Sequence, residues 1–124
     1  MGFTLHSAVI ITSFQEDAAN KAHAMALRCG CQATEIATSV VNSHCTFVVL
    51  PHGSKAGWAE AEAGDASRAA FVGWLDKQRF DDSSSVFEWV EVEYSSDLYG
   101  YGHKRGARLV QTVWDGRRAE ESAG

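Results

Sequence analysis

Two spacings of apolar residues alternate along the chain, and each predicts one type of secondary structure. Runs rich in β-branched residues occupy 5–13, 34–41 and 45–50, and such residues favour the pleated, buried surface of a strand. Within 15–29, apolar and mostly small residues recur every three or four positions, which predicts a helix with one narrow buried face. The first half is therefore expected to form a strand, a helix and two further strands.

Local signals mark where these elements end. The predicted helix carries Glu16 and Asp17 in its first turn and is followed by Gly30, which suits the left-handed backbone that ends many helices. The residues Asn-Ser-His at 42–44 have turn chemistry, and the segment is short enough for a hairpin. We therefore expect the strands on either side of 42–44 to pair antiparallel.

A second helical stretch is expected over 55–78, after Pro51 and Gly53 end the preceding strand. Gly64 followed by Asp65 interrupts this stretch. Because aspartate is a good first residue for a new helix, we expect either a kink or two helices here.

Two more strands complete the pattern, at 86–95 and 107–114, with a glycine-rich connection at 98–106. The resulting order, βαββαβ plus one strand, is that of a ferredoxin-like split βαβ sandwich. We predict an α+β fold with an antiparallel sheet, two helices on one face and an extra C-terminal strand. Residues 1–116 would form a single domain and 117–124 a flexible polar tail.

Composition and charge narrow the classes of function. The 124 residues are 45% hydrophobic and 22% charged, which is typical of one globular domain. Sixteen acidic residues against eleven Lys and Arg give a net charge of −5, so the molecule repels phosphate backbones and anionic membranes. Its apolar runs are too short to span a bilayer. Neither membrane binding nor strong nucleic-acid binding is therefore expected.

The cysteines and the N-terminus indicate the compartment. Cys29, Cys31 and Cys45 are an odd set that cannot all pair within the chain, whereas small secreted domains carry even disulfide frameworks. The first residues have no basic segment and no apolar core of the length that a signal peptide needs. We therefore expect a cytoplasmic protein.

Negative charge gathers around the strand at 86–95. Alternation places two aromatic rings and two carboxylates on one face of that strand, with a third carboxylate just beyond it. Such a face is either a solvated outer surface or a recognition surface, because aromatic residues anchor interfaces and carboxylates attract basic partners. The second interpretation predicts a non-enzymatic module, an inhibitor or accessory protein of the phage or mobile-element type, that binds a basic protein. The candidate protein-binding residues are Phe87, Trp89, Glu91, Glu93 and Asp97.

The loop at 99–105 offers an alternative site, because it combines glycines, stacking rings and cations. These residue types hold single-stranded nucleic acid or a phosphorylated ligand. The alternative function is therefore a small phosphoester- or nucleotide-binding protein or enzyme. Its candidate ligand-binding residues are Tyr99, Tyr101, His103, Lys104, Arg105 and His44.

His44, Cys45 and Thr46 resemble the His-x-Thr strand motif of the two-histidine phosphoesterases. In that family a pair of such motifs supplies an acid and a base to a cyclic phosphate. The segments that begin at His6 and His103 have Ala and Arg at the third position, so the second motif is missing. His44 is then a turn residue that opens a strand, and we predict no catalytic residue.

Metal and cofactor signatures are also incomplete. Cys29 and Cys31 are separated by one residue, which is shorter than the spacing of zinc knuckles, and they follow a helix whose C-terminal dipole disfavours a thiolate. The glycines near residue 100 lie between strands rather than before a helix that could hold phosphate. We predict no metal and no cofactor.

Self-association is a further expectation about partners. Ferredoxin-like sheets often pair through an open face or edge, and four tryptophans in 124 residues include candidates for burial in an oligomer.

Overall fold

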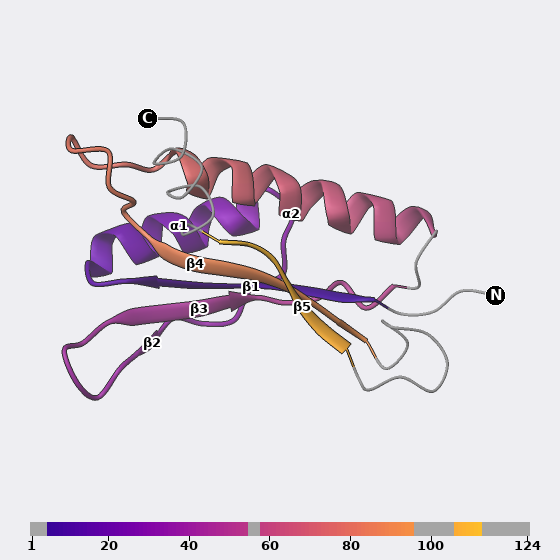
Figure 1. Ribbon diagram of the computed structural model, residues 1–124, viewed down its shortest axis with the longest axis horizontal. Coiled ribbons are helices and arrows are strands. Elements are labelled where there is room, and N and C mark those ends of the chain that lie inside the picture. The colour runs from indigo at the N-terminus through magenta and orange to yellow at the C-terminus, as the bar shows by residue number, and fades with distance from the viewer. Residues whose placement is uncertain (1–4, 55–57, 96–105, 113–124) are drawn as a thin grey trace.

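Strands and helices follow one another in the predicted order in a computed structural model that describes residues 5–54, 58–95 and 106–112 (Figure 1). The elements are β1 (His6–Ser13), α1 (Glu16–Arg28), β2 (Ala37–Thr38), β3 (Cys45–Val49), α2 (Ala59–Lys77), β4 (Glu88–Ser95) and β5 (Gly106–Thr112). The predicted α+β class is therefore confirmed. The predicted domain boundary and the tail at 117–124 lie outside the described residues.

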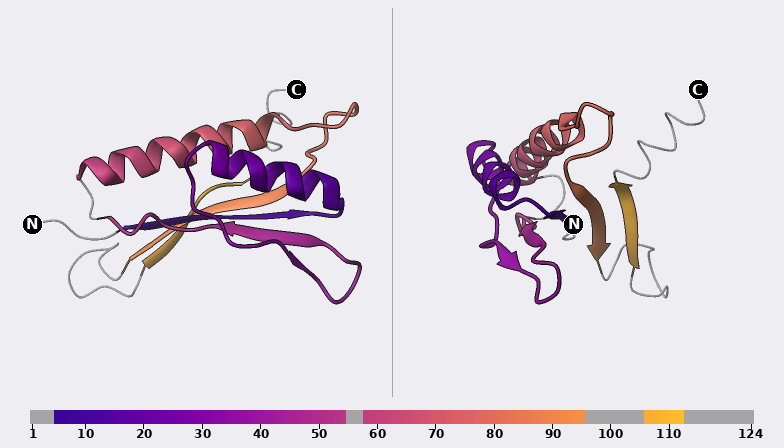
Figure 2. Two further views of the ribbon diagram at one scale, coloured as in Figure 1. Left: turned by 180° about the vertical axis from the view of Figure 1, so that it is seen from behind. Right: turned by 90° about the vertical axis from the view of Figure 1, so that its left-hand side faces the viewer.

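The five strands form one antiparallel sheet in the order β2-β3-β1-β4-β5. The connection from β1 through α1 to β2 passes over β3, and the connection from β3 through α2 to β4 passes over β1. These skipped strands are the feature of a split βαβ sandwich. Both helices lie on one face of the sheet (Figure 2), and β5 extends the sheet beyond β4.

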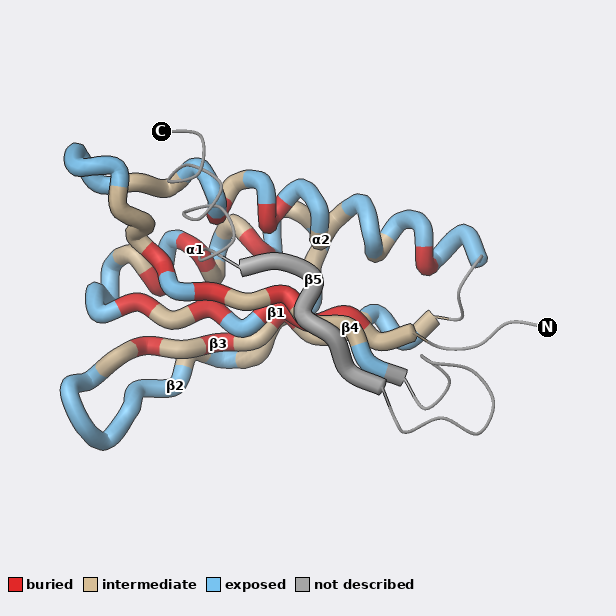
Figure 3. Tube along the Cα trace, in the orientation of Figure 1, coloured by how far each residue is buried: buried red, intermediate tan, exposed pale blue. Residues whose placement is uncertain are grey.

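The hydrophobic core lies between the helices and the central strands. Val9 and Ile11 of β1 point into it, and Phe71 and Leu75 of α2 meet them there with almost no exposed surface. Figure 3 shows how buried and less buried positions alternate along β1 and β3. Burial of apolar surface stabilises the fold by about 25 cal/mol per Å². This hydrophobic effect is the main contribution that holds the helices on the sheet.

The close packing of α1 follows from its small residues. Ala19, Ala22 and Ala26 are its buried positions, and side chains of this size let the helix backbone approach the sheet. The acidic first turn and the glycine after the helix are both where the sequence predicts them, and Gly30 has a left-handed φ of 95°.

The helix α2 runs without a break through Gly64 and Asp65, so the predicted division into two helices is wrong, and the kink stays a prediction. Asp65 does not cap a helix, because its carboxylate instead contacts His52 and Arg68. Packing explains why residue 64 is a glycine, because a Cβ at this position would overlap the His52 ring. Tertiary contacts therefore explain both residues that suggested a break.

The strand predicted at 34–41 is mostly irregular, because β2 has only the residues Ala37–Thr38. Thr34 replaces part of the ladder: its N–H donates to the Val48 carbonyl, and its hydroxyl accepts from the Val48 N–H, each across 2.9 Å. The turn is where the sequence predicts it, and Asn42 and Ser43 have φ values of 63° and 50°. The predicted antiparallel pairing is confirmed, over a shorter ladder.

Candidate functional site

The predicted acidic and aromatic face of β4 points toward the helices. Phe87, Trp89 and Glu91 expose 2%, 5% and 6% of their surface, and the Phe87 ring lies 5.9 Å from the ring of Trp74 on α2. The expectation that these three residues form an exposed recognition surface is therefore wrong. Glu93 is half-buried, and Asp97 lies outside the described residues.

Glu91 belongs to a chain of charged side chains that joins β4 to α2. The Arg68 Nε donates to Glu91 Oε2 across 2.6 Å, and Arg68 Nη2 lies 3.1 Å from Asp65 Oδ1. His52 Nε2 lies 3.2 Å from the same Asp65 oxygen. The burial of the Glu91 charge is compensated by these contacts, which gives that carboxylate a structural role.

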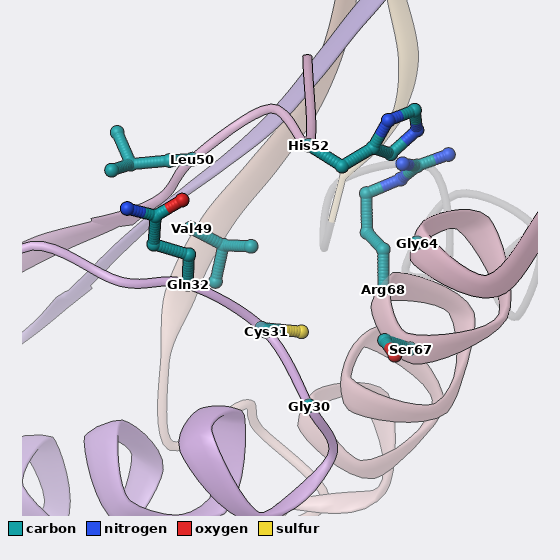
Figure 4. A pocket seen from close by; sticks show the side chains of 9 residues that line it. All are labelled: Gly30, Cys31, Gln32, Val49, Leu50, His52, Gly64, Ser67 and Arg68. Atoms are coloured by element: carbon teal, nitrogen blue, oxygen red, sulfur yellow. The ribbon is translucent and has the colours of Figure 1, made fainter. Parts of the chain in front are cut away.

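A cavity of about 210 Å³ lies beside this chain of charges, between α2 and the segments 30–32 and 49–52. Figure 4 shows the Cys31 sulfur pointing toward α2 and the Arg68 side chain extending toward His52. A second cavity of about 160 Å³ also has Arg68 and His52 in its lining, together with Glu93.

The polar groups of the first cavity are poorly arranged for nucleophilic catalysis. Burial raises the pKa of the Cys31 thiol, and the nearby Cys29 adds to this effect while Arg68 opposes it, so the thiol stays protonated. His52 Nδ1 accepts a hydrogen bond from the Ser54 N–H across 3.1 Å, and its Nε2 is left to donate to Asp65. Both ring nitrogens are engaged, so His52 is not placed to take a proton from a substrate.

The sequence did not indicate His52, Asp65 and Arg68 as a group, because they lie on a loop and a helix that meet only in the fold. The one sequence signal for this group is Gly64, which interrupts an otherwise helical pattern. A glycine inside a helix often marks a place where another segment packs closely against the helix backbone.

Of the six residues predicted for the alternative ligand site, only His44 lies in the part of the chain that the structure describes. His44 lies in the turn before β3, and its N–H donates to the Ser39 hydroxyl across 2.9 Å. Its predicted companions, Tyr99, Tyr101, His103, Lys104 and Arg105, lie outside the described residues, so their convergence remains a prediction. Within 5–54, 58–95 and 106–112, no three His, Cys, Asp or Glu side chains are grouped to hold a metal ion.

An exposed pair of aromatic rings lies at the end of the molecule where β1 leads into α1. Phe14 is 60% exposed and Phe80 is 37% exposed, and their ring centroids are 6.3 Å apart. Phe14 follows β1 directly, whereas Phe80 belongs to the connection from α2 to β4, and Figure 1 shows both segments at the same end. Sequence reasoning missed this pair.

Hydrogen bonds fix the segment that carries Phe80. The Phe80 N–H donates to the Ser84 carbonyl across 2.8 Å, and the Ser83 N–H donates back to the Phe80 carbonyl across 2.9 Å. Arg79 joins the segment to α2, because its guanidinium contacts the carbonyl and the carboxylate of Asp76. The exposed ring is thus held in place by its own loop.

Exposed carboxylates adjoin both rings in the sequence. Glu16 and Asp17 begin α1 just after Phe14, while Asp81 and Asp82 follow Phe80. Ser84 donates to Asp82 through its hydroxyl and its N–H, and these bonds lower the pKa of the Asp82 carboxyl. We call this surface the acidic–aromatic end. Its residues are Phe14, Glu16, Asp17, Phe80, Asp81 and Asp82.

Comparisons with known proteins do not assign a family. No family model matches the chain, and no curated protein is significantly similar to it. One solved structure, the non-canonical dimeric guanylyl cyclase domain of the RhoGC fusion protein from the aquatic fungus Blastocladiella emersonii, is similar with a TM-score of 0.28 and 14% identity. The match covers 98% of this chain and 76% of that one. A similarity this low transfers neither activity nor assembly, and the fold described above follows from the strand order alone.

Within the described residues, neither α1 nor α2 is long and apolar enough to cross a membrane.

Proposed function

We propose that this chain is a non-enzymatic protein-interaction module, an inhibitor or accessory protein that binds a basic partner through the acidic–aromatic end. The observation that carries the proposal is the pair formed by Phe14 and Phe80, two large apolar side chains that remain in water although the fold holds them side by side. This assignment keeps the predicted class of partner and moves the binding surface from the β4 face to the end of the molecule.

The two kinds of residue at this end have complementary effects on binding. Covering exposed phenylalanine rings with a partner removes apolar surface from water, which makes the free energy of binding more favourable. A ring that is already held in place loses little conformational entropy on binding. Carboxylates around the rings attract a basic surface over longer distances and favour its correct orientation. Arginine side chains on the partner can also stack on the ring faces. A basic protein fits this end better than a neutral or acidic one.

The nearby cations leave the negative charge in excess. Arg79 is engaged with Asp76, and Lys77 in the last turn of α2 is the neighbouring basic residue. Four carboxylates closely follow Phe14 or Phe80 in the sequence, so the acidic–aromatic end keeps a net negative charge at neutral pH.

The test compares a double variant, Phe14→Ser with Phe80→Ser, against Leu27→Ser in capture experiments from a host lysate. Leu27 is 52% exposed on α1, so its substitution removes a similar apolar side chain outside the proposed site. We expect wild type and Leu27→Ser to capture the same basic protein, and the double variant to bind it roughly 30-fold more weakly or worse, as for hot-spot residues. Circular dichroism confirms that each variant is folded.

Two results would contradict the proposal. One is capture of the same partner by the double variant with unchanged affinity. The other is a thermal shift of the wild type with a nucleotide and no captured protein, because a specific ligand at 100 times its dissociation constant adds about 2.7 kcal/mol. That second result would favour the alternative site that includes His44 and the 99–105 loop.

A further inference from the structure

The helix-facing side of the sheet changes from apolar to polar at one end. Val9 and Ile11 of β1 are buried in the core, and Ser7, the next residue on the same face, exposes only 5% of its surface. On the neighbouring strand β4, Glu93 lies directly opposite Ser7 in the register. Polar side chains therefore occupy positions at this end where the rest of the sheet carries core residues.

These two polar residues line the cavity of about 160 Å³ whose wall also includes Arg68 and His52. Figure 1 shows the beginnings of β1 and α2 at the same end of the molecule, and residues from both elements line the cavity. Leu5 and Ala61 add an apolar part to the wall. Because a water molecule in the liquid takes up about 30 Å³, the cavity has room for roughly five non-hydrogen atoms.

The Ser7 hydroxyl is the observation that points to a ligand. Within 5–54, 58–95 and 106–112 this hydroxyl has no hydrogen-bond partner, although Ser7 is buried in the wall of the cavity. A buried hydroxyl without a partner costs free energy, and most buried polar groups in proteins are satisfied. Ser7 therefore offers a donor and an acceptor to a molecule inside the cavity.

Negative charge exceeds positive charge around the cavity. Its carboxylates are those of Glu62, Asp65 and Glu93. Arg68 is already engaged by Glu91 and Asp65, across 2.6 and 3.1 Å. Arg108 of β5 lies opposite Glu93 in the register, and the carboxylates remain in excess when its charge is counted. The electrostatic field therefore favours a cationic ligand over an anionic one.

We propose that this cavity binds a short aliphatic primary amine in its protonated form. An ammonium group has three N–H donors and no acceptor. One N–H donates to the Ser7 hydroxyl and another to the Glu93 carboxylate, because residues directly opposite in a sheet have Cβ atoms about 4.5–5.5 Å apart. A carboxylate has about four acceptor positions, so Glu93 can bind the ammonium in addition to the contact that it already makes. The hydrocarbon chain lies against Leu5 and Ala61.

This site is separate from the acidic–aromatic end. The cavity lies beside the first turns of α2, which begins at Ala59, whereas Phe80 follows the last turn of that helix. The inference therefore goes beyond the proposed function. Its test is also independent, because Phe14→Ser with Phe80→Ser leaves the cavity unchanged.

Titration with butylammonium chloride at constant ionic strength, followed by the backbone amide NMR signals of the full chain, tests the proposal. We expect saturable shifts at Ser7, Ala61 and Glu93, with a Kd on the order of 1 mM for a ligand of this size. Tetramethylammonium has the same charge and no N–H donor, so it should bind about 10-fold more weakly or worse. The absence of saturable shifts up to about 20 mM butylammonium would mean that only water fills the cavity, which overturns the proposal.

A lysine derivative distinguishes a free amine from a lysine side chain of a partner. Lysine with its α-amino and carboxyl groups blocked as amides carries the same alkylammonium group on a peptide backbone. That backbone exceeds the size of the cavity, so we expect this compound to bind about 10-fold more weakly than butylammonium. Binding as tight as that of butylammonium would overturn the assignment to a free amine.

Three variants locate the ammonium group. Glu93→Gln removes the charge and keeps the shape, so it should raise the Kd about 10-fold or more, and Ser7→Ala should raise it about threefold or more. Glu88→Gln makes the same change as Glu93→Gln on the same strand, at an exposed position, and should leave the Kd unchanged. A Glu93→Gln variant that binds as tightly as the wild type would overturn the proposal.

The stability of Ser7→Ala without amine separates binding from a structural role. Because the Ser7 hydroxyl has no partner to lose within the described residues, this variant should unfold at the same urea concentration as the wild type or at a higher one. A clearly lower midpoint would show that the hydroxyl supports the fold, and it would overturn the role assigned to Ser7.

Discussion

Arg68 lies between carboxylates from two different elements. Its Nε contacts Glu91 of β4 across 2.6 Å, and its Nη2 contacts Asp65 one turn earlier in α2 across 3.1 Å. A carboxylate on the buried side of a sheet is tolerated only when a cation and hydrogen bonds compensate its lost hydration. Arg68 therefore allows β4 to carry Glu91 inward.

Replacing Arg68 with methionine should lower the free energy of unfolding by about 3 kcal/mol or more, since loss of one partner of a buried ion pair costs ~3–5 kcal/mol. Adding Glu91→Met should recover much of this loss, because an apolar pair needs no compensation. Arg79→Met is the control: its contact with Asp76 is exposed, so the loss should be about 1 kcal/mol or less. Urea unfolding measures all of these variants. A double variant no more stable than Arg68→Met would show that the buried charge is not the cause.

The same residues explain why the sequence alone predicts the wrong direction for the β4 face that carries Glu91. Alternation correctly separates Phe87, Trp89 and Glu91 from Glu88 and Val90 between them, but alternation alone does not say which face is buried. The charge of Glu91 suggested an outward direction. Its partner Arg68 is 23 positions away on a helix, and no local pattern connects the two.

At the scale of elements, the two glycines of α2 have opposite environments. A Cβ at Gly64 would overlap the His52 ring, whereas a Cβ at Gly73 would have no atom within 4 Å. His52 has little freedom to move aside, because Ser54 and Asp65 bind its two nitrogens. At Gly73 helix propensity therefore acts alone, whereas at Gly64 helix propensity and packing oppose each other.

Alanine substitutions separate these two effects. Gly73→Ala should stabilise the protein by about 0.5–1 kcal/mol, which is the difference in helix propensity between the residues. Gly64→Ala gains the same propensity but displaces the His52 ring, so we expect a net destabilisation of about 1–3 kcal/mol, as for other overpacked sites. Thermal and urea unfolding measure both variants. A stabilised Gly64→Ala would mean that the loop with His52 does not rest on α2.

Elements whose boundaries depend on nearby residues are predicted accurately from the sequence, whereas elements that depend on distant contacts are not. The observed β1 and α1 differ from the predicted 5–13 and 15–29 by a residue at their ends, because β-branched runs and helical spacing act within each segment. The expected break at Gly64 is wrong because a distant ring requires that glycine. The strand at 34–41 is short because the Thr34 side chain occupies a ladder position, which residue preferences do not indicate.

At the scale of the molecule, negative charge occurs at both ends of the helical layer. Glu60 and Glu62 lie in the first turn of α2, and Asp81 and Asp82 follow its last turn. The 19 residues of α2 separate the two groups by about 28 Å, which exceeds the Debye length of about 8 Å at physiological salt. Each group therefore acts locally, and only one of them adjoins the exposed rings of Phe14 and Phe80.

Two double variants with the same change in net charge test whether the location of the charge matters. Asp81→Asn with Asp82→Asn should slow association with the captured basic partner about tenfold at low salt, because these carboxylates attract the surface that docks on the rings. Asparagine keeps an oxygen that can accept from Ser84, so the loop should keep its shape. Glu60→Gln with Glu62→Gln should change the rate less than about twofold, since its charges are screened from the docking site.

Surface plasmon resonance between about 0.1 M and 1 M salt measures the association rates of both double variants. The difference between the two rates should vanish as the Debye length falls toward about 3 Å. Equal effects of the two variants would mean that net charge alone governs association. That result would contradict the proposal that the acidic–aromatic end is the docking surface.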